Sequence, residues 1–371
     1  MDILHINSYS IASGLYKNLY RKLDNKGIKQ KVYIPIKNKT DRRKNVINLK
    51  NGTFYYVNTF NNIDRVLYFT KISKSYKGLL NNVEIKDIDV AHAHSLFVNG
   101  GIANELYKDY KVKYITAVRN TDLNLFFKYF LHLRKKGIEI LKNAYKIIFI
   151  SPAHRKRLLN NYIPENIKEE IKEKAIVVPN GINDYWLKNR KSKFKSLDGN
   201  INLLYAGRID KNKNVMTICK VTSELNKKGI ETSLKIIGKG PEKKRIIKYA
   251  NKFSYINVLG YMSKEKLLNN YRESDIFIMP SYNETFGLVY VEAMSQGLPI
   301  VYTKNEGVDG YFKKGEVGYA VSPDNIEGIV NKVKFIINDY DNISRRALSL
   351  SKKFSWDRVS DIYIELYSTL Q

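Results

Sequence analysis

One segment of this 371-residue chain limits its fold more than any other, the run from Asp275 to Pro299. It begins with an apolar run at 275–280 that ends in a proline, which predicts a buried parallel strand followed by a loop. Apolar residues then recur at helical spacing from 289 to 294, and Gly297 marks the end of that helix. A strand that passes through a short loop into a helix is a unit of an α/β sheet, where ligands bind at the carboxyl ends of the strands.

Two glutamates of this segment are candidates for ligand contacts. Glu284 lies in the loop after the strand, and Glu292 is expected about two turns into the helix. A carboxylate accepts hydrogen bonds from hydroxyl groups with charge-assisted strength. The backbone N–H groups of Phe286, Gly287 and Leu288, at the helix start, favour an anion. Taken alone, the glutamates are equally explained as a first-turn residue and a solvated helix residue.

Short β-rich runs alternate with amphipathic stretches along both halves of the chain, which is the pattern of βαβ units. We predict strands at 2–6, 31–35, 90–92, 112–118, 145–150, 202–206, 233–237, 256–259, 275–279 and 299–302. The halves are expected to meet near Asn180-Gly181, before a basic, exposed stretch at 188–195. The predicted fold is α/β with two domains, 1–180 and 181–353.

Three more motifs accompany the first segment. Val178–Ile182 lies at the predicted junction, Leu203–Asn214 contains Gly207-Arg208 with a lysine five residues on, and Ile236–Pro241 contains a Gly-x-Gly pair. In this order they resemble the signature of the family 4 retaining glycosyltransferases, over nearly the whole chain and most densely at 178–300. The resemblance implies the GT-B fold, two facing Rossmann-like domains with a cleft between them. It also implies an N-terminal acceptor-binding domain, a C-terminal nucleotide-sugar-binding domain, and a last helix at 354–371 that packs back on the first domain.

The resemblance implies donor-site roles for residues of the second half. Arg208 and Lys213 match a phosphate-binding pair that would stabilise the charge of the departing nucleotide. Glu292 matches the glutamate that binds the ribose hydroxyls, and Glu284 matches the one that holds the transferred sugar. The remaining expected donor contacts are the N–H groups of Phe286, Gly287 and Leu288 at the pyrophosphate, Gly207, and the loop glycines Gly238 and Gly240 beside the base or ribose.

In the first half, Gly14 matches one glycine of the family's Gly-Gly loop, and Ser13 replaces its partner. A serine there predicts a less open loop. His94 follows a predicted strand and matches the histidine that contacts the donor sugar near the reacting carbon. His94 is therefore an expected catalytic residue, together with Glu284, Arg208 and Lys213. We expect His92 to point into the core or to the far side of the sheet.

Arg119 and Asp122 end the next strand and are expected to bind the acceptor or a phosphate on it. The stretch that follows, 123–136, mixes aromatic and basic residues. As an amphipathic helix it fits a membrane interface, and it fits the core equally well because its aromatic residues have ordinary core spacing.

The chain carries 64 basic and 36 acidic residues, a net charge of +28. Residues 1–180 hold 33 basic and 15 acidic residues, so the first half is the more basic one. Such a field attracts anionic lipid, nucleic acid or acidic polymers. Compositional drift explains it equally well, because Lys, Asn, Ile and Tyr are all abundant.

We expect a cytoplasmic protein, peripheral on the inner face of the membrane where it meets lipid. There is no run of eighteen apolar residues, the start does not read as a signal peptide, and the single cysteine, Cys219, fits a reducing compartment. No cofactor and no metal are expected, because Asp87-Ile-Asp89, which has metal-motif spacing, runs into the strand before His94.

The expected activity is that of a metal-independent retaining hexosyltransferase. A sugar would pass from a nucleotide diphosphate sugar, with UDP as the expected nucleotide, to a glycan or lipid-linked saccharide in cell-envelope or capsular polysaccharide synthesis. Three alternatives stay open: another GT-B nucleotide-sugar enzyme such as an epimerase, a silent sugar-nucleotide sensor, and a basic nucleic-acid-binding protein. The last lacks any recognised nucleic-acid-binding module.

Overall fold

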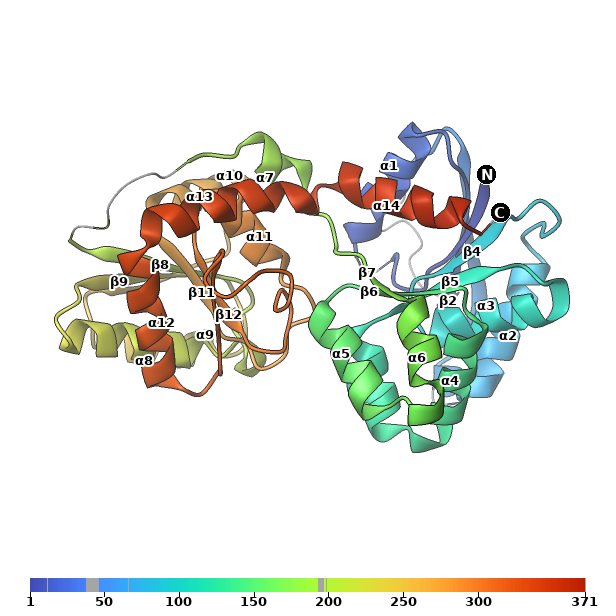
Figure 1. Cartoon of the computed structure of the whole chain (residues 1–371), viewed down its shortest axis with the longest axis horizontal. Coiled ribbons are helices and arrows are strands. Elements are labelled where there is room, and N and C mark those ends of the chain that lie inside the picture. Colours follow the sequence, from blue (N-terminus) through green and yellow to red (C-terminus); the bar gives the residue numbers. More distant parts are fainter. Residues whose placement is uncertain (12, 38–46, 66, 193–196, 198, 371) are drawn as a thin grey trace. The chain divides into compact units, whose positions relative to one another are not determined.

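The computed structural model describes residues 1–11, 13–37, 47–65, 67–192, 197 and 199–370 (Figure 1). The chain forms two compact units, each with its own parallel sheet. Unit 1 comprises residues 1–150, 154–179 and 356–371, and unit 2 comprises residues 151–153 and 180–355. The basic stretch predicted at 188–195 falls partly outside the described residues.

The sheet of unit 1 has seven parallel strands in the order β3-β2-β1-β4-β5-β6-β7. The strands are β1 (Asp2–Ile6), β2 (Lys29–Lys37), β3 (Gly52–Phe60), β4 (Val90–Ala93), β5 (Tyr114–Val118), β6 (Lys146–Phe149) and β7 (Ala175–Val177). The α-helices are α1 (Leu15–Asn25), α2 (Tyr68–Leu80), α3 (Val98–Tyr110), α4 (Arg134–Asn143), α5 (Pro152–Asn161), α6 (Glu165–Lys174) and α14 (Trp356–Ser368). Helices on both faces explain why the central strands are almost continuously apolar.

Unit 1 has one large core cluster on the side of α2, α3 and α4 and another beneath α1 and α14. The last helix, α14, is held to α1 by two ion pairs, Lys22 to Asp357 at 2.8 Å and Lys26 to Asp361 at 2.5 Å. Its buried face carries Tyr363 and Tyr367, which lie under β1 and β4. The C-terminal helix is therefore part of unit 1.

The sheet of unit 2 has six parallel strands in the order β10-β9-β8-β11-β12-β13. The strands are β8 (Ile201–Ala206), β9 (Thr232–Ile237), β10 (Ile256–Leu259), β11 (Ile276–Met279), β12 (Ile300–Thr303) and β13 (Gly318–Val321). The α-helices are α7 (Asp184–Lys188), α8 (Val215–Lys227), α9 (Lys243–Ala250), α10 (Lys264–Glu273), α11 (Leu288–Met294), α12 (Ile326–Asn338) and α13 (Tyr340–Leu350).

In both units the strand order reverses beside the first strand, between β1 and β4 and between β8 and β11. At such a reversal the loops at the carboxyl ends diverge and leave a crevice for ligands. All ten predicted strands are present, and each end lies within two residues of the predicted one. The sequence pattern missed β3, β7 and β13, which are sheet-edge strands with weak alternation.

Candidate functional site

The carboxyl edge of the sheet in unit 2 is built from two interlocked loops, one after β8 and one after β11. Asn212 binds the second loop three times: its carbonyl accepts the N–H of Tyr282 at 2.8 Å, its Oδ1 accepts the N–H of Asn283 at 3.0 Å, and its Nδ2 donates to the carbonyl of Asn283 at 2.9 Å. Asn214 adopts a left-handed conformation (φ +53°), which asparagine tolerates, and its Nδ2 donates to the carbonyl of Pro323 at 2.9 Å. The two loops therefore form one rigid edge.

This edge brings Lys213 and Glu284 together as an ion pair. Lys213 Nζ lies 2.5 Å from Glu284 Oε2, and the side chains are only 21% and 10% exposed. The turn that presents Lys213 is the short helix at 211–213, capped by the Asp210 side chain, which accepts the N–H of Lys213 at 3.0 Å. The sequence predicts that the two side chains contact different parts of a donor, and the structure shows them paired with each other.

Glu306 supports this pair and was missed by the sequence analysis. Its buried carboxylate accepts the backbone N–H of Glu284 at 3.0 Å, and the N–H of Gly307 donates to the carbonyl of Glu284 at 2.9 Å. Gly307 has φ +51°, and a Cβ there would lie 2.9 Å from Glu284 Cγ. The available signal was a Glu-Gly pair just beyond β12, the neighbour of β11.

Close packing of two loop backbones explains the paired glycines after β9. A Cβ on Gly238, which has φ +156°, would lie 1.8 Å from the carbonyl oxygen of Gly207, and one on Gly240 would lie 2.1 Å from the carbonyl oxygen of Ile209. Only glycine permits both approaches. These glycines shape the wall of the site through backbone contacts.

Two neighbouring cavities open at this edge. One, of about 290 Å³, is lined by Asn180, Lys213 and Glu284 together with the loop at 285–289. The other, of about 640 Å³, is more apolar, and Arg208, the loop at 238–241, Tyr261, Met262 and Leu267 line it. Ala206, Gly207 and Val289 line both. The two cavities therefore adjoin. The smaller one contains the Lys213–Glu284 ion pair, and the larger one is mainly apolar, with Arg208 in its lining.

The start of α11 presents unused hydrogen-bond donors to the smaller cavity. The N–H groups of Phe286, Gly287 and Leu288 have no acceptor in the described part of the chain. Gly287, the N-cap residue, has φ +80°, and a Cβ there would lie 2.4 Å from the Tyr290 ring. Arg208, which lines the larger cavity, is 72% exposed and held loosely by Asp210 at 3.2 Å. These donors and cations suit a diphosphate.

Glu292 lies in the second turn of α11, closer to the helix start than predicted, since α11 begins at Leu288. Burial raises the pKa of its carboxyl group to about 7. The Tyr271 hydroxyl approaches the carboxylate only to 3.5 Å. Glu292 is thus no solvated helix residue, and within the described residues it lines neither cavity, whereas Val289 lines both.

In unit 1, Ser13 lies in the loop after β1, and its Oγ accepts the N–H of Leu15 at 3.3 Å. Gly14, the N-cap residue of α1, is exposed with φ −70°, a conformation open to any residue. The structure therefore gives no backbone reason for glycine at position 14.

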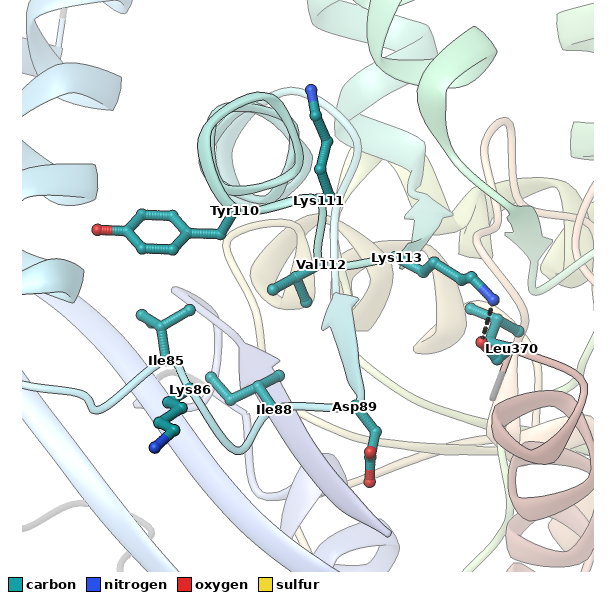
Figure 2. Close-up of a pocket in the computed structure, with 9 residues that line it drawn as sticks. All are labelled: Ile85, Lys86, Ile88, Asp89, Tyr110, Lys111, Val112, Lys113 and Leu370. Carbon is teal, nitrogen blue, oxygen red and sulfur yellow. Dashed lines mark hydrogen bonds between the residues drawn. The ribbon is translucent and has the colours of Figure 1, made fainter.

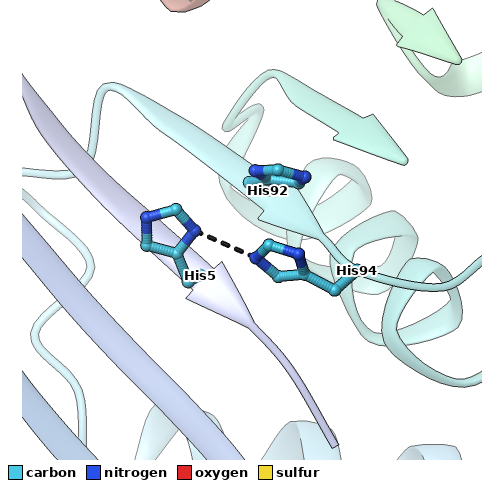
Figure 3. Close-up of side chains that lie close together, drawn as sticks. All are labelled: His5, His92 and His94. Carbon is cyan, nitrogen blue, oxygen red and sulfur yellow. Dashed lines mark hydrogen bonds between the residues drawn. The ribbon is translucent and has the colours of Figure 1, made fainter. Parts of the chain in front are cut away.

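His94 belongs to a buried cluster with His5 and His92 (Figure 3). His5 Nδ1 and His94 Nε2 are hydrogen-bonded at 3.1 Å, and the His92 ring stacks on the His94 ring with centroids 3.9 Å apart. His92 points into the core, one of its two expected positions, and it lies beside His94 because residues two apart share one face of a strand. Tyr16 contacts the His94 ring edge-on at 5.0 Å.

The three histidines are the described group that could hold a metal, since their donor atoms lie within 4.8 Å of one another. The stacked rings of His92 and His94 direct their in-plane lone pairs along separate planes, however, and His92 Nδ1 is bonded to the Tyr367 hydroxyl at 2.7 Å. Burial lowers the pKa of His5 to about 3 and also lowers the pKa values of His92 and His94. The cluster is a neutral, hydrogen-bonded core, and His94 Nδ1 has no partner in the described chain.

Arg119 and Asp122 have different roles at the end of β5. Asp122 is 1% exposed, and its carboxylate accepts the N–H groups of Leu96, Phe97 and Arg119 at 2.8–3.1 Å. Asp122 therefore holds the local backbone together and does not make the predicted contact with an acceptor. Burial raises the pKa of its carboxyl group to about 6. Arg119 is half-buried, donates from Nε to the carbonyl of His94 at 2.9 Å, and stays available for an anion.

A further cavity of unit 1, of about 460 Å³, lies at the opposite edge of the sheet, before β4 and β5 (Figure 2). Lys86, Lys111, Lys113 and Asp89 line it, and Lys113 donates to the carbonyl of Leu370 at 2.6 Å. None of the predicted site residues lines this cavity. It is remote from the strand ends where ligands of parallel sheets bind.

Comparison with known proteins agrees with this architecture. Residues 188–353 match the family described as glycosyl transferases group 1. An uncharacterized glycosyltransferase of Methanocaldococcus jannaschii is 27% identical over 323 residues, which span 82% of this chain and 84% of that protein.

Two solved structures cover the whole chain. Sucrose-phosphate synthase from Thermosynechococcus elongatus superposes with a TM-score of 0.77 at 16% identity, over 100% of this chain and 99% of that one. Anabaena HepE, solved in complex with UDP, superposes with a TM-score of 0.70 at 13% identity, over 100% of both chains. The chain therefore has the GT-B fold, and its residues 188–353 match the glycosyl transferases group 1 family.

Proposed function

We propose that this chain is a retaining hexosyltransferase that moves a sugar from a nucleotide diphosphate sugar to a saccharide acceptor. The observation that carries the proposal is the Lys213–Glu284 pair, set in a cavity beside three unused backbone N–H groups. A diphosphate sugar brings anionic phosphates for the lysine and hydroxyl groups for the glutamate. Donor binding would thus exchange one internal ion pair for two charge-assisted contacts.

The reaction asks this site mainly for electrostatic stabilisation. As the nucleotide leaves, negative charge collects on its distal phosphate. Arg208, Lys213 and the N–H groups of 286–288 would face that charge, and fixed donors of this kind stabilise a transition state without reorganising. On this account the chain supplies the positive charge itself, and we propose that no metal is required.

The adjoining apolar cavity would hold the nucleoside. Tyr261, Met262 and Leu267 offer apolar surface for a base, and Gly238 and Gly240 keep the backbone close to the cavity. UDP is the expected nucleotide, supported by the structural neighbour solved with UDP. Glu292 is assigned to the ribose hydroxyls, which requires a bound ribose to reach past Val289.

Arg119 is the proposed acceptor-binding residue of unit 1. His94 Nδ1 is the proposed donor-sugar contact, which requires this buried atom to become accessible to the sugar. The acceptor is proposed to be a glycan or a lipid-linked saccharide of cell-envelope or capsular polysaccharide synthesis. The relatives that carry glycosyltransferase names support transfer over epimerisation. Nothing in the described site favours nucleic acid.

A donor screen followed by product analysis tests this function. Thermal shifts should single out one nucleotide, UDP by expectation, among UDP-, GDP-, ADP- and TDP-sugars, equally with EDTA and with Mg²⁺. The sugar should then be released or transferred with its anomeric configuration retained, as judged by NMR. An inverted product, a metal requirement or an epimerised donor would each overturn the corresponding part of the proposal.

A further inference from the structure

We infer that unit 1 docks on an anionic lipid bilayer through one exposed aromatic patch that follows Asp122 in sequence. We call this surface the aromatic patch and define it by Phe69, Phe126, Tyr129, Phe130 and Leu131. The inference rests on the proposed function in one respect, the lipid-linked acceptor. None of the described helices could cross a membrane, so contact with a bilayer would be made at its surface.

The segment that the sequence predicted as one amphipathic helix folds as three short pieces. A π-helix spans Asp122–Phe127, a 3₁₀ turn spans Leu131–Leu133, and α4 begins at Arg134. Between the first two pieces the chain turns outward. Tyr129 is 62% exposed, Leu131 is 61% exposed and Phe130 is 38% exposed, so the core alternative does not account for these three residues. The residues that point inward, Leu123, Phe127 and Leu133, are in the core of unit 1.

The start of α2 extends the same surface. Phe69 is 62% exposed, and its neighbour Tyr68 contacts the half-buried Phe126 with ring centroids 6.4 Å apart. Phe126 in turn contacts Phe130 at 5.5 Å. The two segments, distant in sequence, therefore meet through the buried Tyr68 ring, which contacts both Phe69 and Phe126. Exposed apolar surfaces of this kind mark interaction sites in proteins.

The exposed charges around the aromatic patch are positive, which favours a negatively charged partner. The segments 61–77 and 121–138 contain only two acidic residues, Asp64 and Asp122. Both are buried: Asp64 is paired with Lys74 at 2.7 Å, and Asp122 accepts backbone N–H groups. Lys128 and Lys135, by contrast, are exposed, and Lys128 Nζ lies 5.1 Å from the Tyr129 ring centroid. Outward aromatics with flanking lysines fit anionic headgroups at a bilayer interface.

Most of the aromatic patch follows Arg119 closely in the sequence, which links membrane docking to acceptor binding. Arg119, the proposed acceptor-binding residue, lies three residues before the π-helix, in the same unit. A saccharide carried on a membrane lipid would be presented beside the surface on which the patch rests. Docking therefore raises the local concentration of a lipid-linked acceptor near Arg119.

Vesicle flotation tests the inference with the full chain. The probes are phosphatidylcholine vesicles with and without phosphatidylglycerol, and the test variant is Tyr129→Ser with Leu131→Ser. Phe335→Ser is the matched control, because Phe335 is a 47% exposed aromatic residue of α12 in unit 2. A second pair compares Lys128→Glu with Lys227→Glu, an exposed lysine of α8.

Wild type and both controls should float with the anionic vesicles, more weakly at high salt, and not with the neutral ones. The Tyr129/Leu131 variant should lose at least about tenfold in binding, and Lys128→Glu should lose part of it. Equal flotation of the patch variant and wild type, or no flotation of wild type, overturns the inference. A stabilising shift with UDP in every variant would keep the donor site intact, so failure of docking is separable from failure of the proposed function.

Discussion

The carboxyl edges of the two sheets occupy equivalent positions in their units, yet their chemistry is opposite. In unit 2 the edge carries an ion pair, an exposed arginine and unused N–H groups around two open cavities. In unit 1 the equivalent edge is filled by His5, His92 and His94, neutral and buried among tyrosines. The polar groups at the edge of unit 2 line cavities that a ligand could enter, whereas those at the edge of unit 1 are buried and bonded to one another.

The difference lies in what occupies the strand tips. In unit 1 each histidine of the cluster uses one ring nitrogen in a hydrogen bond to another histidine or to Tyr367, and its other ring nitrogen is buried. Lys213 and Glu284 are paired with each other. A ligand that carries both a negative charge and hydroxyl groups could replace this contact, because its charge would bind Lys213 and its hydroxyl groups would bind Glu284. The edge of unit 2 is thus poised for a ligand, and the predictions below test that contrast.

The largest effect is expected from Lys213→Ala. It removes the cation proposed for the leaving phosphate and leaves the Glu284 carboxylate without its partner, so sugar transfer or donor hydrolysis should fall about 10²-fold or more. Initial rates with the donor chosen by the screen give the measurement. Lys211→Ala is the control, since Lys211 is exposed and in the same turn. Equal losses in both variants would remove Lys213 from its proposed role.

Gly238→Ala should break the wall between the two loops. Its Cβ would meet the carbonyl oxygen of Gly207 at 1.8 Å, so we expect a loss of at least about 2 kcal/mol in unfolding free energy and weaker nucleotide binding. Gly229→Ala is the control: Gly229 also has positive φ (+75°), but nothing lies within 4 Å of its added Cβ. Denaturant midpoints and UDP titrations of the pair separate local strain from damage to the site. Similar binding by both alanine variants would show that the glycine contact is unimportant for the ligand.

The histidine cluster should make unit 1 sensitive to acid. The pKa of His5 is about 3 in the folded chain and about 6.5 in the unfolded chain. Between these pH values the imidazole of His5 is protonated only in the unfolded chain. Stability from this group is complete above about pH 6.5 and is lost as pH falls toward 3. The loss should reach about 2 kcal/mol at pH 5. His5→Gln should reduce that slope in urea unfolding at pH 7 and pH 5, and an unchanged slope would contradict the burial argument.

Glu292 should make nucleotide binding depend on pH. Its pKa of about 7 means that the carboxylate is mostly ionised at pH 8 and mostly protonated at pH 6. If the ionised form binds the ribose hydroxyls, affinity for UDP should fall about tenfold between those values. Calorimetric titrations at both pH values, with Glu292→Gln as a pH-insensitive reference, give the measurement. The same pH dependence in the variant would assign the titration to another group.

Much of unit 2 could be predicted because its constraints are local. The strands have continuous apolar runs, and Gly238 and Gly287 occupy positions where the backbone demands glycine. Glu306 could not be predicted, because its contact with Glu284 depends on β12 lying beside β11 and joins residues 22 positions apart in the sequence. The Lys213–Glu284 contact, 71 residues apart, was likewise beyond any spacing rule.

Unit 1 was harder to predict for a different reason. The aromatic stretch after Asp122 has helical spacing, yet a π-helix shifts the register and turns Tyr129 outward. Asp122 looked like a ligand contact because it follows a strand, but three backbone N–H groups use its carboxylate. A sequence shows which polar residues reach an edge, and not whether the chain itself already uses them.

Amide hydrogen exchange with and without saturating UDP tests the central contrast most directly. The account predicts protection in unit 2 at 207–214, 238–241 and 284–292, with little change around the histidines of unit 1. Protection confined to the loops after β1, β4 and β5, or the absence of protection in unit 2 at saturating nucleotide, would contradict the assignment of the donor site.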